Sequence, residues 1–371
     1  MKPTENQPQK VVFRKRRSKK TILLHWLIFL LAAAAVISAV PLTFLAVHKI
    51  GKAALYGKTQ SASMEMQREE LPEVSLENYD PEAVKYKGGI YHYNKDILTF
   101  LVMGIDKMQP VNRKPNPKAD FREGGQADAL FLVSANPHTK EIFVVAINRN
   151  ALAPVEVYDK YGNYITTQME PVSLQHGFGT GLEDSCERQV KCVSEMFYKL
   201  PIAGYAAINM GIFIPLNDAI GGVELPLLHK EPDGSWRLNQ QPGTMVHLMG
   251  QDALDYVHER DADKFASANE RLERQKQYIT AFIPKAVSAV KQDIGLVTRL
   301  YDIANRYMVT DIDLSKAVFL AGEMLGYTFN TEAMYSLQGE MVLDEDGFEK
   351  FHVDEDALYD LIMQLYYEKI S

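Results

Sequence analysis

The chain has 371 residues, of which 46% are hydrophobic and 24% are charged. These fractions are those of an ordinary folded protein, so they exclude a fibrous or wholly disordered chain, and the length allows one large domain or two small ones. The formal net charge of −8 is unevenly distributed, because residues 1–20 carry eight Lys/Arg and one acid, and the remaining chain carries 32 basic and 47 acidic residues. A basic N-terminus therefore precedes an acidic body.

Residues 21–47, TILLHWLIFLLAAAAVISAVPLTFLAV, contain no acid, lysine or arginine. An apolar run of this length exceeds the ~20 residues that an α-helix needs to cross a bilayer. By the positive-inside tendency, the preceding basic residues place the N-terminus in the cytoplasm and the main domain outside the cell. We expect an uncleaved single-pass transmembrane helix in the cell membrane. A cleaved signal peptide is the alternative, although its apolar region is normally only ~7–15 residues long.

The basic tail, residues 1–20, has two interpretations. Clustered Lys/Arg can bind nucleic acid, but beside an apolar span they are the expected topology signal and attract anionic lipid. We therefore predict the lipid bilayer as a partner and no nucleic acid.

The two cysteines, Cys186 and Cys192, could form a disulfide outside the cell. If both lie in one α-helix, they are separated by ~9 Å of rise and roughly 240° of rotation, which does not fit the ~4.4–6.8 Å Cα separation of a disulfide. A bridge would require Cys186 to lie in the loop before the helix. The sequence leaves this pairing open.

After the apolar run, residues 48–95 are polar and show neither strand alternation nor a helical stripe. We predict an extracellular stalk there. Residues 97–103, ILTFLVM, form a short apolar run closed by glycine, which predicts a buried strand. Asp106 would then lie just beyond the C-terminal end of this strand.

A β-hairpin is predicted next, because the apolar segments 129–135 and 141–147 flank the turn residues NPHTK. Asp128 precedes the first strand of this antiparallel pair and Arg149 follows the second. Both side chains therefore lie at the end opposite the turn, where Asp106 can join them.

The rest of the chain predicts more strands and helices around this hairpin. In chain order we expect a hairpin in VEVYDKYGNYIT, a helix with an Asp/Ser cap in DSCERQVKCVSEMFYKL, a strand in GYAAINM, a short helix ended by Gly221, a strand in VELPLL, a helix from about Gly250, a long helix over 268–292 and a tail of helices with a turn at DEDG. We predict an α/β fold with a mixed central β-sheet and helices packed on it, in one domain over residues 96–371.

The long predicted helix carries a polar face. Arg271, Arg274, Gln275 and Tyr278 are spaced i, i+3, i+4 and i+7 and therefore share one side. Glu270 can pair with Arg274 in an ordinary exposed salt bridge worth ~0.3–0.5 kcal/mol. Arg271 has no acid three or four residues away, so an acid from another element or a bound anion must compensate its charge.

Phosphate is the anion that best suits several arginines, Arg260 included, because each guanidinium offers paired N–H donors to two oxygens. If Asp106 and Asp128 face the same place, a divalent cation between them and the phosphates explains why carboxylates accompany arginines, and Mg²⁺ favours such oxygens. From the residues alone, Asp106 could instead cap a turn, and Asp128 could simply pair with Arg149.

The histidines are weaker candidates for catalysis. His176 and His258 each stand alone, and a single histidine is more often structural or solvated than catalytic. No Ser/His/Asp set, metal-binding His/Cys cluster or P-loop stands out in the sequence.

Seven motifs follow one another from about residue 97 to 286: LVMGIDKM, GGQADALFLVSANP, VVAINRN, LPIAGYAAINM, LNDAIGGVELPL, MGQDALDYVHERD and RLERQKQYI. In this order they resemble the LytR-CpsA-Psr family of membrane-anchored cell-wall transferases. The resemblance implies an extracellular α/β domain that transfers a phosphoglycosyl polymer from a polyprenyl-pyrophosphate carrier to peptidoglycan, assisted by Mg²⁺ or Mn²⁺. It also implies an apolar tunnel for the polyprenyl chain, and FLVMG, ALFL and GIFIPL are candidates for its lining.

By position, the resemblance also implies a role for each candidate residue. Asp106 and Asp128 match the aspartates on the metal side. The candidates for catalysis at the pyrophosphate are Arg149, Arg260 and Arg271. Those for substrate binding are Arg274, Gln275 and His258.

Several residues depart from the family's pattern at this site. Positive or acidic residues usual in the family are replaced by Gln126, Asn150, His258 and Ala268, and a lysine expected near residues 169–173 is missing. Two functions therefore remain open. The first is a working phosphotransferase, which the retained aspartates and arginines favour. The alternative is a catalytically degenerate protein that binds lipid-linked wall precursors as a regulator or scaffold.

Overall fold

The computed structural model describes residues 45–61, 63–66, 83–114, 120–228, 241–260, 264–293, 295–324 and 326–370. The predicted basic tail, residues 1–20, and almost all of the predicted transmembrane helix, residues 21–47, lie outside the described residues. Within the described part of the chain, no helix has both the length and the apolar character that crossing a bilayer requires.

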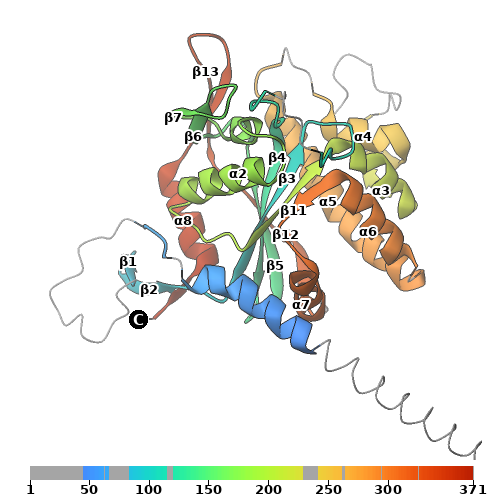
Figure 1. Cartoon of the computed structure of the whole chain (residues 1–371), viewed down its shortest axis with the longest axis horizontal. Helices are drawn as coiled ribbons and strands as arrows, with labels where there is room; N and C mark the ends of the chain where they lie inside the picture. Colours follow the sequence, from blue (N-terminus) through green and yellow to red (C-terminus); the bar gives the residue numbers. More distant parts are fainter. Residues whose placement is uncertain are drawn as a thin grey trace, which may run out of the picture.

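Strands and helices are interspersed along the chain (Figure 1). The strands are β1 (Val84–Tyr86), β2 (Gly89–Tyr93), β3 (Leu98–Ile105), β4 (Ala127–Asn136), β5 (Glu141–Ile147), β6 (Leu152–Tyr158), β7 (Tyr164–Pro171), β8 (Gly204–Asn209), β9 (Val223–Pro226), β10 (Met245–Leu248), β11 (Met308–Thr310), β12 (Thr328–Ser336), β13 (Gly339–Leu343), β14 (Glu349–Val353) and β15 (Tyr367–Lys369). The α-helices are an unlabelled one over residues 45–60, then α2 (Glu183–Met196), α3 (Phe213–Ala219), α4 (Gly250–His258), α5 (Ser267–Gln292), α6 (Leu296–Tyr307), α7 (Leu314–Met324) and α8 (Glu355–Tyr366). Two short 3₁₀ helices are η2 (Val172–Gly177) and η3 (Met210–Ile212).

A six-stranded mixed sheet forms the centre of the domain, in the order β11-β8-β3-β4-β5-β12. β3, β4 and β5 are antiparallel neighbours, whereas β8 is parallel to β3 and β12 is parallel to β5. The predicted mixed sheet with helices packed on it is therefore confirmed. The predicted NPHTK hairpin is the connection between β4 and β5.

Alternate side chains of the central strands are buried against different helices. Leu130 and Leu132 of β4 belong to the core that α2 and α8 cover, whereas Phe131 packs with Leu272 and Ile279 of α5. This is the two-residue period of a strand with both faces covered. Figure 1 shows α2 and α8 on one side of the sheet and α5 on the other.

Parts of the segment predicted as a stalk, residues 48–95, pack on the domain. The helix over residues 45–60 buries Leu55 completely, in a cluster with Leu98, Ala203 and Phe319. β2 pairs with β1 and with β15 near the C-terminus. The domain boundary predicted at residue 96 is therefore too late, because a few buried apolar residues in a mainly polar segment are enough to attach it.

The two cysteines do not form a disulfide. Cys186 and Cys192 both lie inside α2, and both are buried and free. α2 begins at Glu183, ahead of its predicted cap Asp184–Ser185, whose side chains accept hydrogen bonds from the loop before the helix. Cys186 therefore does not take the loop position that a disulfide would need. Burial raises the pKa of both thiols, which keeps them protonated and unreactive.

The C-terminal tail contains strands that the sequence did not predict, besides the expected helices. β12 is an edge of the central sheet, and β13 and β14 form a hairpin at the predicted DEDG turn. In this turn the Asp344 carboxylate accepts a hydrogen bond from the Phe348 N–H at 2.8 Å, and Gly347 has a φ of 82°. Lys350 Nζ of β14 lies 3.5 Å from Glu170 Oε2 of β7. The β13–β14 hairpin therefore contacts the β6–β7 hairpin.

Candidate functional site

Three polar residues meet where β3, β4 and β5 reach one edge of the sheet. Asp106 follows β3, Asp128 is the second residue of β4, and Arg149 comes shortly after β5. Nη1 of Arg149 lies 2.9 Å from both carboxylate oxygens of Asp128. The Asp106 N–H donates to the carbonyl of Gln126, at the start of β4, at 3.0 Å. The convergence predicted from the antiparallel connections is therefore confirmed.

The predicted polar face of α5 is buried, and it carries Arg271, Arg274, Gln275 and Tyr278. Nη1 of Arg271 donates to Asp128 Oδ2 at 3.5 Å and to the carbonyl of His258 at 3.4 Å. Asp128, an acid from another element, thus compensates the positive charge of Arg271. This is one of the two possibilities that the sequence left open. Asp128 joins Arg271 to Arg149.

Arg274 and Gln275 contact the C-terminal end of α4. Nε of Arg274 donates to the carbonyl of Tyr256 at 2.8 Å, and Nε2 of Gln275 donates to that of Val257 at 3.0 Å. A helix leaves its last carbonyls unpaired, and cations are favoured at that end. These contacts fix α4 against α5, and the substrate contacts expected of both side chains remain predictions. The sequence left open an exposed salt bridge between Arg274 and Glu270 as one interpretation, but Arg274 is buried because α4 covers it.

The cluster around Asp128 has an excess of positive charge. Burial lowers the pKa of Arg271 to about 10, and the neighbouring charges of Arg149, Arg260 and Arg274 act in the same direction. Burial likewise lowers the pKa of Arg149, and Arg260 adds to this effect. The buried Nε of Arg149 has no hydrogen-bond partner among the described residues. A multiply charged anion would relieve the repulsion and supply the missing acceptor.

The end of α4 brings two further predicted residues to this edge. Nε2 of His258 lies 3.9 Å from Asp106 Oδ1, whose side chain is 56% exposed. Arg260 is half-buried and lines the same cleft as Arg149. The structure thus brings together the three arginines predicted to be catalytic, with Asp106 and His258 on the exposed side.

His176 has a structural environment, as its isolation in the sequence indicated. Its Nδ1 lies 3.0 Å from the carbonyl of Gly125, and its backbone N–H donates to Gln189 Oε1 at 2.9 Å. Burial lowers the pKa of His176 to about 4, so the ring is neutral at physiological pH and Nδ1–H donates to the carbonyl. The hydrogen bond of this ring connects η2 to the loop before β4.

An apolar cavity of about 180 Å³ lies between the sheet and helices α3 and α5. Its lining includes residues of all three stretches proposed from the sequence for a tunnel, among them Val102, Phe131 and Phe213. Gln275 also lines it, one turn of α5 away from Arg271. The cavity therefore borders the arginine cluster.

A polar cleft of about 900 Å³ reaches the same cluster. Its walls are the β6–β7 and β13–β14 hairpins, and Arg149 and Arg260 line it. The start of β4 joins the two spaces, because Gln126 lines the cleft, Asp128 binds the arginines, and Ala129 lines the apolar cavity.

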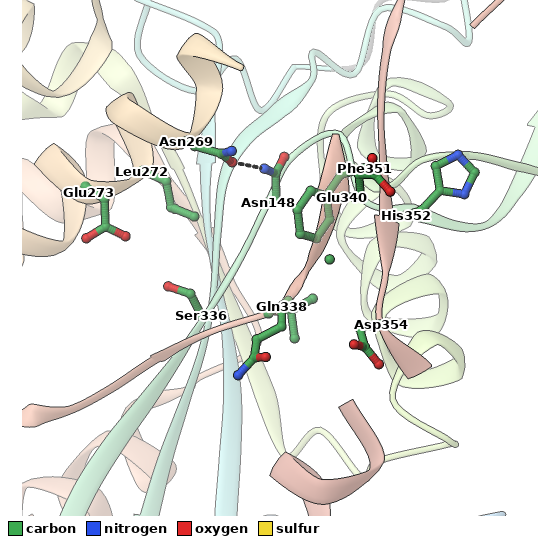
Figure 2. Close-up of a pocket in the computed structure, with 12 residues that line it drawn as sticks. Asn148, Asn269, Leu272, Glu273, Ser336, Gln338, Glu340, Phe351, His352 and Asp354 are labelled. Atoms are coloured by element: carbon green, nitrogen blue, oxygen red, sulfur yellow. Dashed lines mark hydrogen bonds between the residues drawn. The ribbon is translucent and has the colours of Figure 1, made fainter. Parts of the chain in front are cut away.

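A third space, of about 720 Å³, lies between α5 and the strands β12 to β14 (Figure 2). Asn148 Nδ2 donates to Asn269 Oδ1 at 2.5 Å, and the dashed line in Figure 2 marks this hydrogen bond. Among its described lining residues there is no arginine or lysine, and three are the acids Glu273, Glu340 and Asp354. This space lacks the charge to hold a diphosphate, so the arginine cluster is the candidate site.

Two carboxylates are available for a metal ion. Across the described ranges, no group of three or more His, Cys, Asp or Glu side chains is arranged to hold one. Oδ1 of Asp128 is buried and accepts no well-directed hydrogen bond from the described residues, and the carboxylate of Asp106 is open to solvent. This donor set fits a cation such as Mg²⁺, which takes its other ligands from phosphate and water.

A profile of the LytR_cpsA_psr family matches residues 53–365. The chain belongs to this family. It is 26% identical over 260 residues, or 69% of this chain and 71% of the relative, to the polyisoprenyl-teichoic acid–peptidoglycan teichoic acid transferase TagU of Oceanobacillus iheyensis. Two solved structures share the fold. Protein gbs0355 from Streptococcus agalactiae has a TM-score of 0.55 and 19% identity over 72% of this chain and 87% of its own, and B. subtilis TagV has a TM-score of 0.52 and 20% identity over 73% and 97%.

Two departures from the LytR_cpsA_psr pattern make specific contacts in this chain. Gln126, at a position where the resemblance leads us to expect an arginine, accepts a hydrogen bond from Arg149 Nη2. Asn150, at a position where the resemblance leads us to expect an aspartate, donates from Nδ2 to Glu349 Oε2 at 3.2 Å. An arginine in place of Gln126 would repel Arg149, and an aspartate in place of Asn150 would repel Glu349. Each substitution therefore suits its neighbour.

The sequence did not point to Glu349 or to the two hairpins as parts of the site. The turn at DEDG was predicted, but the strands β13 and β14 on either side of it were not, and nothing local indicated what this hairpin contacts.

Proposed function

We propose that this chain is a phosphotransferase that moves a phosphoglycosyl polymer from a polyprenyl-pyrophosphate carrier to peptidoglycan. The observation that carries the proposal is the arginine cluster, which borders an apolar cavity and a polar cleft. In this proposal the apolar cavity would hold the lipid, the arginines would bind the diphosphate and the polar cleft would hold the glycan. The TagU relative is named for polyisoprenyl-teichoic acid and peptidoglycan, which supports a polymer of the teichoic acid class.

In this reaction an acceptor hydroxyl attacks the phosphorus atom that carries the glycan, and the bond from that phosphorus to the lipid phosphate breaks. Arg149 and Arg271 would bind the phosphate oxygens on which negative charge grows, and Arg260 would do so from the cleft. Asp128 already holds two of these guanidiniums in position. The proton of the acceptor hydroxyl can pass to the His258 imidazole, which lies beside Asp106.

The proposal includes one divalent cation, Mg²⁺ or Mn²⁺. Asp106 and Asp128 would hold it together with oxygens of the diphosphate. When bound, the ion would neutralise charge on the phosphates during transfer. Asp128 would then serve both the ion and the arginines.

The test of this function uses the full-length chain in nanodiscs with a polyprenyl-pyrophosphate-linked teichoic acid precursor and peptidoglycan. We expect radiolabelled glycan to become attached to peptidoglycan and an equal amount of polyprenyl phosphate to be released. Binding of the donor without transfer would favour the second candidate, a catalytically degenerate protein that binds lipid-linked wall precursors as a regulator or scaffold. No binding of the donor would overturn both.

We further propose that the chain is a single-pass protein of the cell membrane. Residues 1–20 would be cytoplasmic, residues 21–47 would form the transmembrane helix, and the domain would be extracellular. The charge asymmetry around the apolar run supports this orientation. Peptidoglycan as acceptor requires the same orientation.

An epitope tag after Ser371 should therefore bind antibody on intact cells from which the wall has been removed. A tag before Met1 should bind antibody only after the membrane is permeabilised, which makes it the internal control. Labelling of the N-terminal tag alone on intact cells would contradict the proposed orientation and, with it, transfer to peptidoglycan.

A further inference from the structure

The walls of the polar cleft are fixed to each other. Lys350 Nζ of β14 lies 3.5 Å from Glu170 Oε2 of β7 and 3.4 Å from Asp344 Oδ2 at the DEDG turn. The backbone N–H of Phe351 donates to the carbonyl of Asn150 at 2.8 Å. These contacts connect both hairpins with the end of β5, so the cleft is preformed.

Two exposed phenylalanines line this cleft. Phe265 is 52% exposed and Phe348 is 69% exposed. Glu349 Oε1 accepts a hydrogen bond from the backbone N–H of Ala266 at 2.6 Å. This bond joins the residue after Phe265 to the residue after Phe348, so the two aromatic side chains start from adjoining backbone segments.

The backbone beside Phe265 is held in a conformation that few residues adopt. Ala266 has a φ of 60° and a ψ of 17°, in the left-handed region. For a residue with a Cβ this conformation costs about 1–2 kcal/mol, and it persists where the surroundings enforce it. Here the hydrogen bond from Ala266 to Glu349 provides that constraint. Phe265 is therefore kept at the cleft although about half of its surface stays exposed.

The remaining lining of the cleft mixes polar groups with apolar side chains such as Val155, Val157 and Leu174. It includes the amides of Gln126 and Gln168 and the carboxylates of Glu170 and Asp346. Such groups bind hydroxyls, whereas the flat, electron-rich face of an aromatic ring packs against the C–H groups of a pyranose ring. A lipid chain would leave these polar groups buried without partners. A saccharide suits both the polar groups and the rings.

We propose that the cleft between the β6–β7 and β13–β14 hairpins is a saccharide-binding site, with Phe265 and Phe348 packing against sugar rings. This rests on the proposed function, because the arginines that line the cleft then bind the diphosphate next to the glycan. Asn150 is a positioning residue. Through Glu349 it holds both backbone segments that carry the phenylalanines.

The test is isothermal titration calorimetry of the full-length chain in nanodiscs with three probes. They are geranylgeranyl pyrophosphate, the same pyrophosphate bearing N-acetylglucosamine, and a free N-acetylglucosamine tetramer. If the cleft takes the donor glycan, the sugar raises the affinity of the pyrophosphate about tenfold. If it takes the acceptor glycan, the free tetramer binds.

Matched variants test whether the affinity gained from the saccharide comes from the cleft. Phe265→Ala and Phe348→Ala should each remove most of the sugar-dependent affinity, and Phe348→Trp should retain it. Tyr301→Ala is the control, because Tyr301 is 65% exposed on α6 and does not line the cleft. Asn150→Asp should weaken saccharide binding, and adding Glu349→Gln should restore it by removing the repulsion between two carboxylates.

The outcomes separate this inference from the proposed function. Sugar-dependent affinity or tetramer binding that survives both phenylalanine-to-alanine changes would overturn the saccharide site and leave the function standing. The same conclusion would follow if geranylgeranyl pyrophosphate bound normally, its sugar added no affinity and the free tetramer did not bind. Binding of the tetramer that depends on the two phenylalanines, without any binding of the pyrophosphate, would establish the saccharide site and overturn the function.

Discussion

Replacing Arg271 by lysine is expected to lower the rate of glycopolymer transfer by about 10²–10³-fold while the domain stays folded. Lysine keeps one positive charge near Asp128 but loses the planar pair of donors that binds two phosphate oxygens at once. Removing a single preorganised donor from a site of developing negative charge has an effect of this size. Alanine is a poorer choice, because Arg271 is only 3% exposed and breaking a buried ion pair costs up to about 3–5 kcal/mol of stability.

Single-turnover transfer, with donor bound before peptidoglycan is added, measures this effect. Arg299→Lys is the matched control, since Arg299 is an exposed residue of α6 that pairs with Asp293 at 2.8 Å, and its rate should equal that of the wild type. Circular dichroism establishes that both variants are folded. A folded Arg271→Lys protein with wild-type transfer would remove Arg271 from the proposed mechanism.

The central strands could be predicted because each is a local pattern. β3 and β5 are apolar runs, and the turn residues between β4 and β5 are explicit in the sequence. β12 could not be predicted in this way, because TFNTEAMYS is an edge strand whose partner β5 lies far earlier in the chain. The part of the first described helix over residues 48–60 was predicted as stalk, because the sequence shows no apolar stripe there, and in the structure Leu55 is buried among largely exposed neighbours.

One part of the site, the polar face of α5, was predictable because helix geometry depends only on residues that are close in the sequence. The spacing of Arg271, Arg274 and Gln275 was enough to place them on one face of α5. Their acceptors were not predictable from the residues, because Arg274 and Gln275 donate to backbone carbonyls of α4, which any sequence would supply. That Asp128 pairs with Arg271 depends on how α5 packs over β4, which involves residues far apart in the sequence.

Asp128→Asn is expected to lower the midpoint of thermal unfolding by about 10 °C. The carboxylate lies between Arg149 and Arg271, with a side chain only 6% exposed, and its removal leaves two mostly buried guanidiniums without the charge that compensates them. Leaving a buried charge unpaired costs about 3–5 kcal/mol, and a few degrees are lost for each kcal/mol in a domain of this size. Inorganic pyrophosphate should restore part of the loss, because it supplies negative charge at the same place and stabilises the folded state that binds it.

Asp106→Asn makes the same chemical change at the exposed carboxylate and is therefore the control. Its thermal midpoint should match the wild type, because substitutions at such positions usually change stability by less than ~0.5 kcal/mol. If the two aspartates hold one Mg²⁺, both variants should nevertheless lose the Mg²⁺ dependence of donor binding. An Asp128→Asn protein that unfolds at the wild-type temperature, with or without pyrophosphate, would mean that the arginines do not need the carboxylate. The excess positive charge of the cluster would then be no argument for an anionic substrate.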